Sequence, residues 1–130
     1  NNVNLKISAT CTRVPIVDGH TAIVNISFSD EKPSIKEFKG IIKSYTSLPQ
    51  TLKLPSAPSQ PIHILDDKDR PQPKLDLKND KGMALSIGRI QKDLFFDLRF
   101  IGLSHNTLRG AAGGAILNAE LLVKKKYIYY

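Results

Sequence analysis

The fold is decided by one segment, MALSIGRIQKDLFFDLRFIGL, which spans Met83–Leu103. Two apolar runs, residues 83–90 and 94–103, flank the polar turn Gln91-Lys92-Asp93 and predict two strands. The second run carries apolar side chains on both faces: Leu94, Phe96, Leu98 and Phe100 on one, and Phe95 and Ile101 beside Asp97 and Arg99 on the other. A sheet that is apolar on both faces suits a buried interface. We therefore expect this sheet to take part in contacts between subunits.

The residues before this segment predict four further elements. Alternating apolar and polar side chains predict an antiparallel pair of strands over residues 5–14 and 20–28, separated by a break at Pro15 and Asp18-Gly19. Ser34-Ile35-Lys36-Glu37 is a capping box, and apolar residues at helical spacing then predict a helix over residues 34–45. A short strand is expected over residues 61–66, between two irregular proline-containing stretches, 48–60 and 66–82.

The residues after the segment predict a last helix over residues 107–124. Its expected apolar stripe consists of Leu108, Ala112, Ala115, Ile116, Ala119 and Leu122. The length of 130 residues and the content of 41% hydrophobic and 24% charged residues indicate an ordinary globular domain. We expect one domain, residues 1–130, of the α+β class: a mixed, largely antiparallel sheet with helices on one face.

The charge and hydropathy patterns argue against two classes of partner. The formal net charge is +7, but the basic residues are spread along the chain, and the one dense cluster is Lys124-Lys125-Lys126. Nucleic-acid-binding proteins usually gather basic residues on one face and add aromatic side chains for stacking. No apolar run approaches the roughly 18 residues that span a bilayer. We therefore expect no nucleic-acid partner and no membrane partner.

The single cysteine, Cys11, excludes an internal disulfide and fits a reducing compartment, so we expect a cytoplasmic protein. Alternation along the first predicted strand puts Cys11 on its apolar face. Free thiols in such positions are usually buried and inert. The pattern therefore predicts a core residue and not a nucleophile.

Three motifs carry a family resemblance: Ala9–His20 (ATCTRVPIVDGH), Ser86–Ile90 (SIGRI) and Gly102–Ala112 (GLSHNTLRGAA). In this order and at this spacing they resemble the aspartate-semialdehyde dehydrogenases. The loop sequences Leu54–Pro58 (LPSAP) and Arg70–Pro73 (RPQP) resemble the branch of the family found in fungi and archaea.

The resemblance implies a reaction and a fold. The family uses NADPH to remove phosphate reductively from aspartyl phosphate, giving aspartate semialdehyde on the route to lysine, methionine and threonine. A cysteine nucleophile forms a thioacyl intermediate, which hydride from the nicotinamide reduces. The implied fold is like the C-terminal domain of the glyceraldehyde-phosphate dehydrogenase-like enzymes, with a homo-oligomer formed through the sheet.

The resemblance also assigns roles to three residues. His20 matches the general acid/base, and an imidazole exchanges protons near neutral pH. Arg13 matches the substrate-binding arginine, whose guanidinium binds a carboxylate in bidentate fashion. Asn106 matches the position at the nicotinamide end of the cofactor. From the residues alone, Arg13 is better explained as a surface residue at a strand end and His20 as a solvated residue at a strand start. Asn106 also suits a helix N-cap, and both roles can hold together.

The remaining candidate residues receive no such role. His63 and His105 are expected to be surface residues, and no metal site is expected. Gly110, Gly113 and Gly114 do not form a dinucleotide-binding fingerprint and are expected to allow close packing of the last helix.

The motifs expected for the nucleophile and for most of the cofactor site do not occur in this chain. We therefore expect a truncated dehydrogenase that is inactive alone, binds no NADP by itself, and needs an N-terminal dinucleotide-binding domain. Two alternatives stay open: a non-catalytic dimerisation or regulatory module of the same fold, and a basic nucleic-acid-binding domain.

Overall fold

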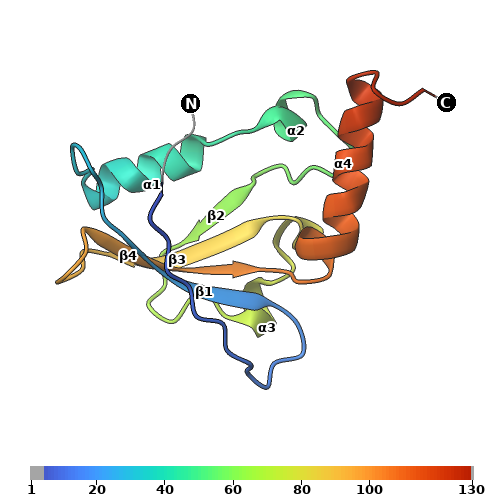
Figure 1. Cartoon of the computed structure of the whole chain (residues 1–130). Coiled ribbons are helices and arrows are strands. Elements are labelled where there is room, and N and C mark those ends of the chain that lie inside the picture. Colours follow the sequence, from blue (N-terminus) through green and yellow to red (C-terminus); the bar gives the residue numbers. More distant parts are fainter. Residues whose placement is uncertain (1–4, 130) are drawn as a thin grey trace.

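The computed structural model describes residues 5–129 and shows a four-stranded mixed sheet with helices (Figure 1). The strands are β1 (His20–Ile26), β2 (Ile62–Leu65), β3 (Leu85–Gln91) and β4 (Leu98–Ser104), arranged in the order β1-β4-β3-β2. β4 pairs antiparallel with both β1 and β3, whereas β2 pairs parallel with β3. The predicted α+β class and the mixed, largely antiparallel sheet are confirmed.

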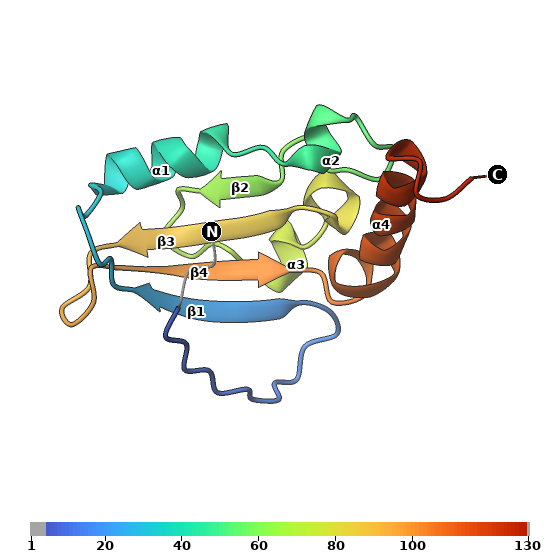
Figure 2. The ribbon, with the colours of Figure 1, turned by 45° about the horizontal axis from the view of Figure 1, so that its top comes forward.

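The helices are α1 (Ile35–Ser44), α2 (Leu48–Thr51), α3 (Pro73–Asp76) and α4 (Gly113–Lys124). Helices α1 and α2 lie on one side of the sheet, as expected, the short α3 lies on the other side, and α4 stands at one end of the sheet (Figures 1 and 2). The predicted capping box at Ser34 is formed in full, with Glu37. Phe38 of α1 packs on Phe100 of β4 with ring centroids 5.9 Å apart, which fixes α1 over this face.

The buried apolar residues form two groups. Ile87, Leu98 and Leu103 lie within the sheet, each at most 2% exposed. Leu54, Met83 and Leu117 form a second cluster, which joins the loop after α2 to α4. This second cluster fixes α4 against the end of the sheet, which Figure 2 shows from another side.

The expected strand over residues 5–14 is wrong. These residues form no strand, and the segment runs past β1 at the border of the sheet (Figure 2). Leu5 and Ile7 are 68% and 79% exposed, so the alternation covers no apolar face here. β1 pairs with β4 instead. The expected core position of Cys11 is wrong for the same reason, because its side chain is exposed.

The hairpin begins β4 later than expected. Leu94, Phe95 and Phe96 lie in the turn and are 95%, 91% and 46% exposed, whereas the expected strand included them. The carboxylate of Asp93 accepts hydrogen bonds from the amides of Phe95 and Phe96 and so stabilises the turn. The apolar character of the run thus comes partly from a turn and not from two faces of one strand.

The two irregular stretches contain more structure than expected. Residues 48–60 include α2, which a second capping box between Ser47 and Gln50 starts. Residues 66–82 include α3 and the 3₁₀ turn η1 (Asn79–Gly82). The backbone at Arg70 approaches β3 so closely that a Cβ atom on Gly88 would overlap the Arg70 carbonyl. This contact explains why a glycine occupies the SIGRI motif.

The predicted last helix is present, as the π-helical turn η2 (Leu108–Ala112) followed by α4. Its expected apolar stripe is wrong, because Ile116 and Leu122 are 55% and 41% exposed whereas Leu117 is buried. The helix is apolar around most of its circumference, so periodicity does not identify the buried face. None of the helices within residues 5–129 is long and apolar enough to cross a membrane.

Candidate functional site at the start of β1

The pairing of β1 with β4 brings two predicted site residues together. His20 begins β1 and lies opposite Ser104, at the end of β4. Asn106 follows two residues later, and its Oδ1 accepts a hydrogen bond from the backbone amide of Gly19 at 3.0 Å. His20 and Asn106 are separated by more than eighty positions in the sequence, yet one hydrogen bond links the residue beside His20 to Asn106.

Gly19 holds a conformation that other residues rarely adopt. Its φ is +108°, in the region that favours glycine. The residue is buried, and a Cβ atom here would lie 3.0 Å from Leu77 Cδ1 and 3.3 Å from Leu103 Cδ1. Gly19 is therefore closely packed against these two side chains, and this packing fixes the backbone at the start of β1. The side chain of the next residue, His20, is exposed.

One explanation of Asn106 was a helix N-cap, but Asn106 does not cap the last helix. His105 does so, because its Nδ1 accepts hydrogen bonds from the amides of Thr107 and Leu108 at 3.2 and 3.3 Å. An accepting Nδ1 means that the ring carries its proton on Nε2 when neutral. His105, expected to be a surface residue, therefore also has a structural role, and the Asn106 side chain is free for its bond to Gly19.

Arg13 lies apart from these residues. It is exposed, in the irregular segment before β1. Within residues 5–129 no hydrogen bond or ion pair joins its side chain to His20 or Asn106. The structure therefore brings together two of the three predicted site residues and leaves Arg13 directed to solvent.

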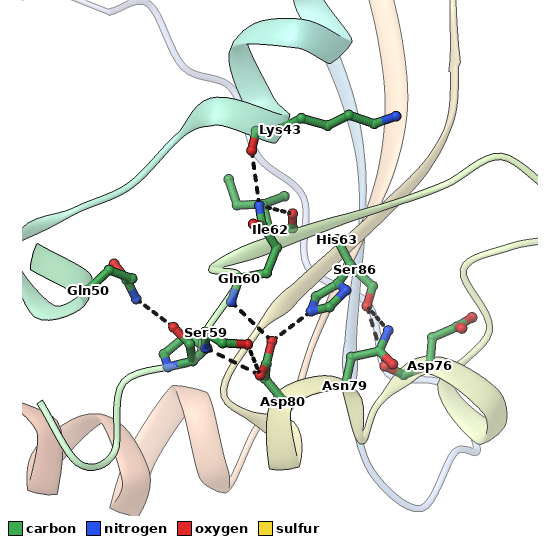
Figure 3. A network of polar contacts seen from close by, with 11 residues as sticks. Lys43, Gln50, Ser59, Gln60, Ile62, His63, Asp76, Asn79, Asp80 and Ser86 are labelled. Atoms are coloured by element: carbon green, nitrogen blue, oxygen red, sulfur yellow. Dashed lines mark hydrogen bonds and ion pairs between the residues drawn. The ribbon is translucent and has the colours of Figure 1, made fainter. Parts of the chain in front are cut away.

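A second polar cluster centres on Asp80 (Figure 3). Its carboxylate contacts His63 Nε2 at 2.8 Å and accepts hydrogen bonds from Ser59 Oγ at 2.8 Å and from the amides of Ser59 and Gln60 at 3.3 Å. Burial alone would raise the pKa of Asp80, but the hydrogen bonds from His63, Ser59 and Gln60 outweigh it and lower the pKa.

This Asp80 cluster is not a nucleophilic triad. The Ser59 hydroxyl donates to Asp80 and not to His63, so no imidazole is placed to take its proton. The cluster instead fastens the loop before β2 to η1, where Asp80 and Lys81 have φ of +46° and +57°. His63, expected to be a surface residue, is partly exposed and pairs with Asp80, a contact that the sequence did not predict. Nothing in the local sequence pairs it with a carboxylate seventeen positions away.

The last helix packs closely through one of its glycines, as expected. A Cβ atom on Gly113 would overlap the Met83 sulfur, so the glycine allows α4 to approach the core. No group of three His, Cys, Asp or Glu side chains among the described residues is arranged to hold a metal ion.

The loop sequence LPSAP has a defined place in the structure. The amide and hydroxyl of Ser56 donate hydrogen bonds of 3.0 and 2.7 Å to the two carboxylate oxygens of Glu120 in α4. Leu54 of the same loop belongs to the buried cluster with Met83 and Leu117. These contacts fasten the loop to α4.

Comparison with known proteins identifies the relatives of this chain. Aspartate-semialdehyde dehydrogenase of Schizosaccharomyces pombe is 47% identical over 121 residues, which are 92% of this chain and 34% of that protein. The enzymes of Aspergillus fumigatus and Archaeoglobus fulgidus are 48% and 46% identical, over 95% and 96% of this chain and 35% of each relative. The chain thus spans about a third of the length of the curated relatives it matches.

Solved structures of the same group of enzymes resemble this chain. Aspartate semialdehyde dehydrogenase with NADP from Candida albicans superposes with a TM-score of 0.82 at 43% identity, covering 89% of this chain and 33% of that chain. Aspartate semialdehyde dehydrogenase II from Vibrio cholerae has a TM-score of 0.68 at 20% identity, over 86% of this chain and 29% of that chain, which supports the fold alone.

The pattern of the family described as "Semialdehyde dehydrogenase, dimerisation domain" matches residues 1–109, which include His20 and Asn106. Together with the relatives in fungi and archaea, this match agrees with the branch that the two loop sequences indicate. The chain belongs to the semialdehyde dehydrogenase family and corresponds to its dimerisation domain.

Proposed function

We propose that residues 1–130 form the C-terminal catalytic and dimerisation domain of an NADPH-dependent aspartate-semialdehyde dehydrogenase. The observation that carries this proposal is the identity of 42–48% with enzymes of that name across nearly the whole chain. The relatives are about three times longer, and one of them was solved with NADP. The remaining two thirds would supply the cysteine nucleophile and the cofactor domain, so this chain alone would be inactive.

In the proposed reaction, His20 acts as the general acid/base. A cysteine from the remaining part of the enzyme attacks the acyl phosphate, and phosphate leaves; NADPH, when bound, supplies the hydride that reduces the resulting thioester. His20 takes the thiol proton before the attack. It then gives a proton to the oxyanion of the hemithioacetal and takes it back when the aldehyde is released. Its exposed position at the start of β1 leaves the imidazole accessible to a substrate.

Arg13 and Asn106 are the proposed binding residues. The Arg13 guanidinium binds the substrate carboxylate in bidentate fashion. The exposed segment that carries it allows the side chain to approach a substrate held between the two domains. The Nδ2 group of Asn106 is proposed to meet the nicotinamide end of the cofactor, since Oδ1 is engaged by Gly19.

The proposed enzyme is a cytoplasmic homo-oligomer that pairs through the sheet. Ile23 and Ile101 lie opposite each other on β1 and β4, on the face turned away from α1. Ile23 is 76% exposed, which is unusual for a large apolar side chain at the centre of a strand pair. A second copy of the same face would bury both side chains.

The test is kinetic, on the complete enzyme that carries this domain. His20→Ala is expected to lower kcat by about a hundredfold or more, because a positioned acid/base group contributes that much. Arg13→Ala is expected chiefly to raise the KM for the substrate. Phosphate-dependent NADPH formation from aspartate semialdehyde is the measurement, and Cys11→Ser is the control that should keep normal activity. Near-normal kinetics for both site variants would show that the assignments are wrong.

A non-catalytic dimerisation or regulatory module is the second candidate, favoured by the match to a domain described by its dimerisation. The coding sequence of the complete protein separates the two candidates. A dinucleotide-binding domain with a cysteine loop in the same chain supports the dehydrogenase, and a protein without that domain supports the module.

A further inference from the structure

The hydrogen bond between Asn106 and Gly19 holds the residue that directly precedes His20. We propose that Asn106 is a positioning residue: its Oδ1 holds the Gly19 amide and thereby fixes the point from which His20 projects. This inference rests on the proposed role of His20 as the acid/base. It adds to Asn106 a role separate from any contact with the cofactor, made by the other atom of the same side-chain amide.

The surroundings of Gly19 explain why this bond matters. The residue is buried beneath Leu77 and Leu103, so its amide has little access to water. The donor is satisfied by Asn106 Oδ1 at 3.0 Å. Without that acceptor the amide would be buried and unpaired, which is costly enough to shift the loop. Any shift at Gly19 moves the first residue of β1, which is His20 itself.

Asn106 is well suited to fix a neighbour because its own backbone is held on both sides. Before it, Ser104 ends β4 and lies opposite His20. After it, the imidazole of His105 caps the amides of Thr107 and Leu108. Gly82 packs closely against the His105 ring, since a Cβ atom on this glycine would lie 3.0 Å from His105 Cδ2. The Asn106 side chain thus extends from a rigid corner between strand and helix.

The two roles of Asn106 can be separated by substitution in the complete enzyme. Asn106→Asp keeps an oxygen acceptor for Gly19 but loses the NH₂ donor, whereas Asn106→Leu has a similar size and keeps neither. If Asn106 positions His20, Asn106→Leu lowers kcat by about tenfold or more, which corresponds to one lost hydrogen bond of about 1.4 kcal/mol. Asn106→Asp keeps the oxygen acceptor, so its kcat is expected to fall less than that of Asn106→Leu, and its KM for NADPH is expected to rise.

A double-mutant cycle with His20→Ala tests whether the effect passes through His20. Because a positioning residue acts only through the group it positions, adding Asn106→Leu to His20→Ala is expected to lower kcat no further. Hydrogen–deuterium exchange of the Gly19 amide is measured in the same variants. The amide is expected to exchange faster in Asn106→Leu and to stay protected in Asn106→Asp and in His20→Ala.

The outcomes are distinct. Additive losses in the cycle, equal losses of kcat in Asn106→Asp and Asn106→Leu, or unchanged exchange of the Gly19 amide in Asn106→Leu would overturn the positioning role. Normal kcat in His20→Ala would instead overturn the proposed acid/base, and the exchange data would still report whether Asn106 fixes the loop. If Asn106→Leu does not fold, Asn106→Ser, whose hydroxyl is too short to reach Gly19, replaces it in every comparison.

Discussion

At the scale of single residues, the carboxylate of Asp76 shows how a buried charge is accommodated. The residue is 2% exposed. Its oxygens accept hydrogen bonds from Arg70 Nε at 2.7 Å and from the amide of Gln72 at 2.6 Å, and the second Arg70 nitrogen pairs with the other oxygen. This bidentate contact fixes the loop between β2 and β3, whose backbone packs against Gly88.

The pair of Arg70 and Asp76 predicts a specific dependence of stability on pH. The Arg70 guanidinium, more than any other group, holds the pKa of Asp76 below its usual value. A carboxyl with a lowered folded-state pKa contributes stability above its unfolded pKa of about 3.9, and the contribution is lost as the pH falls through the folded value. Asp76→Asn is expected to cost about 1–2 kcal/mol at neutral pH, because the charged hydrogen bonds that Arg70 donates to a buried carboxylate are weakened while Arg70 itself stays partly exposed. The cost should shrink towards pH 2.

Urea denaturation across this pH range measures the effect. Asp66→Asn is the matched control, because Asp66 also has a lowered pKa, through Lys39, but its side chain is 67% exposed. Exposed pairs contribute little, so the control should denature like the unchanged chain. A pH-independent loss in Asp76→Asn would point to altered packing in place of lost charge pairing.

The residues of the candidate site were predictable only in part. Arg13, His20 and Asn106 stand in motifs that the family resemblance identifies. The bond of Asn106 to Gly19, the cap made by His105 and the pair of His63 with Asp80 join residues that are distant in sequence or lack a recognisable local pattern. Hydrogen bonds of this kind depend on the tertiary fold, so no reading of spacing along the chain reveals them.

At the scale of elements, a local sequence pattern predicted the structure correctly where its own residues supply the hydrogen-bond partners of the backbone. The capping box at Ser34 closes its own hydrogen bonds, and α1 begins where it predicts. A strand, by contrast, needs a partner for its amides and carbonyls. Residues 5–14 have the alternation but no partner within the described chain, and Leu94–Phe96 have the apolar content but lie in a turn.

Helix α4 gives a direct test of which face is buried. Leu117 is 5% exposed and packs with Leu54 and Met83, whereas the adjacent Ile116 is 55% exposed. Leu117→Ala is expected to lower the free energy of unfolding by about 3 kcal/mol, through lost burial and the cavity left behind. Ile116→Ala, with a similar loss of volume, is expected to cost well under about 1 kcal/mol. Urea denaturation of the 130-residue chain measures both, and equal losses would show that α4 presents a different face to the core.

At the scale of the whole molecule, the two faces of the β1–β4 pair are unequal. One face packs on α1 through Phe100, and the opposite face presents Ile23 and Ile101. Other copies of the chain carry the same net charge of +7, so association through this face must overcome repulsion by apolar burial. The proposed sheet interface therefore depends on the apolar side chains at its centre.

Replacing Ile23 with a charged residue tests that interface. Ile23→Lys puts an ammonium group at the centre of the proposed contact, where burying two such charges across a two-fold axis is strongly unfavourable. Ile41→Lys is the matched control, because Ile41 is similarly exposed, at 61%, but lies on α1, which covers the other face of the sheet. Size-exclusion chromatography with light scattering at micromolar concentration should show a dimer or larger oligomer for the unchanged chain and for Ile41→Lys, and a monomer for Ile23→Lys. If Ile23→Lys stays associated, the interface lies elsewhere, and the Leu94–Phe96 turn is then the surface to substitute, because it presents three consecutive large apolar side chains to solvent.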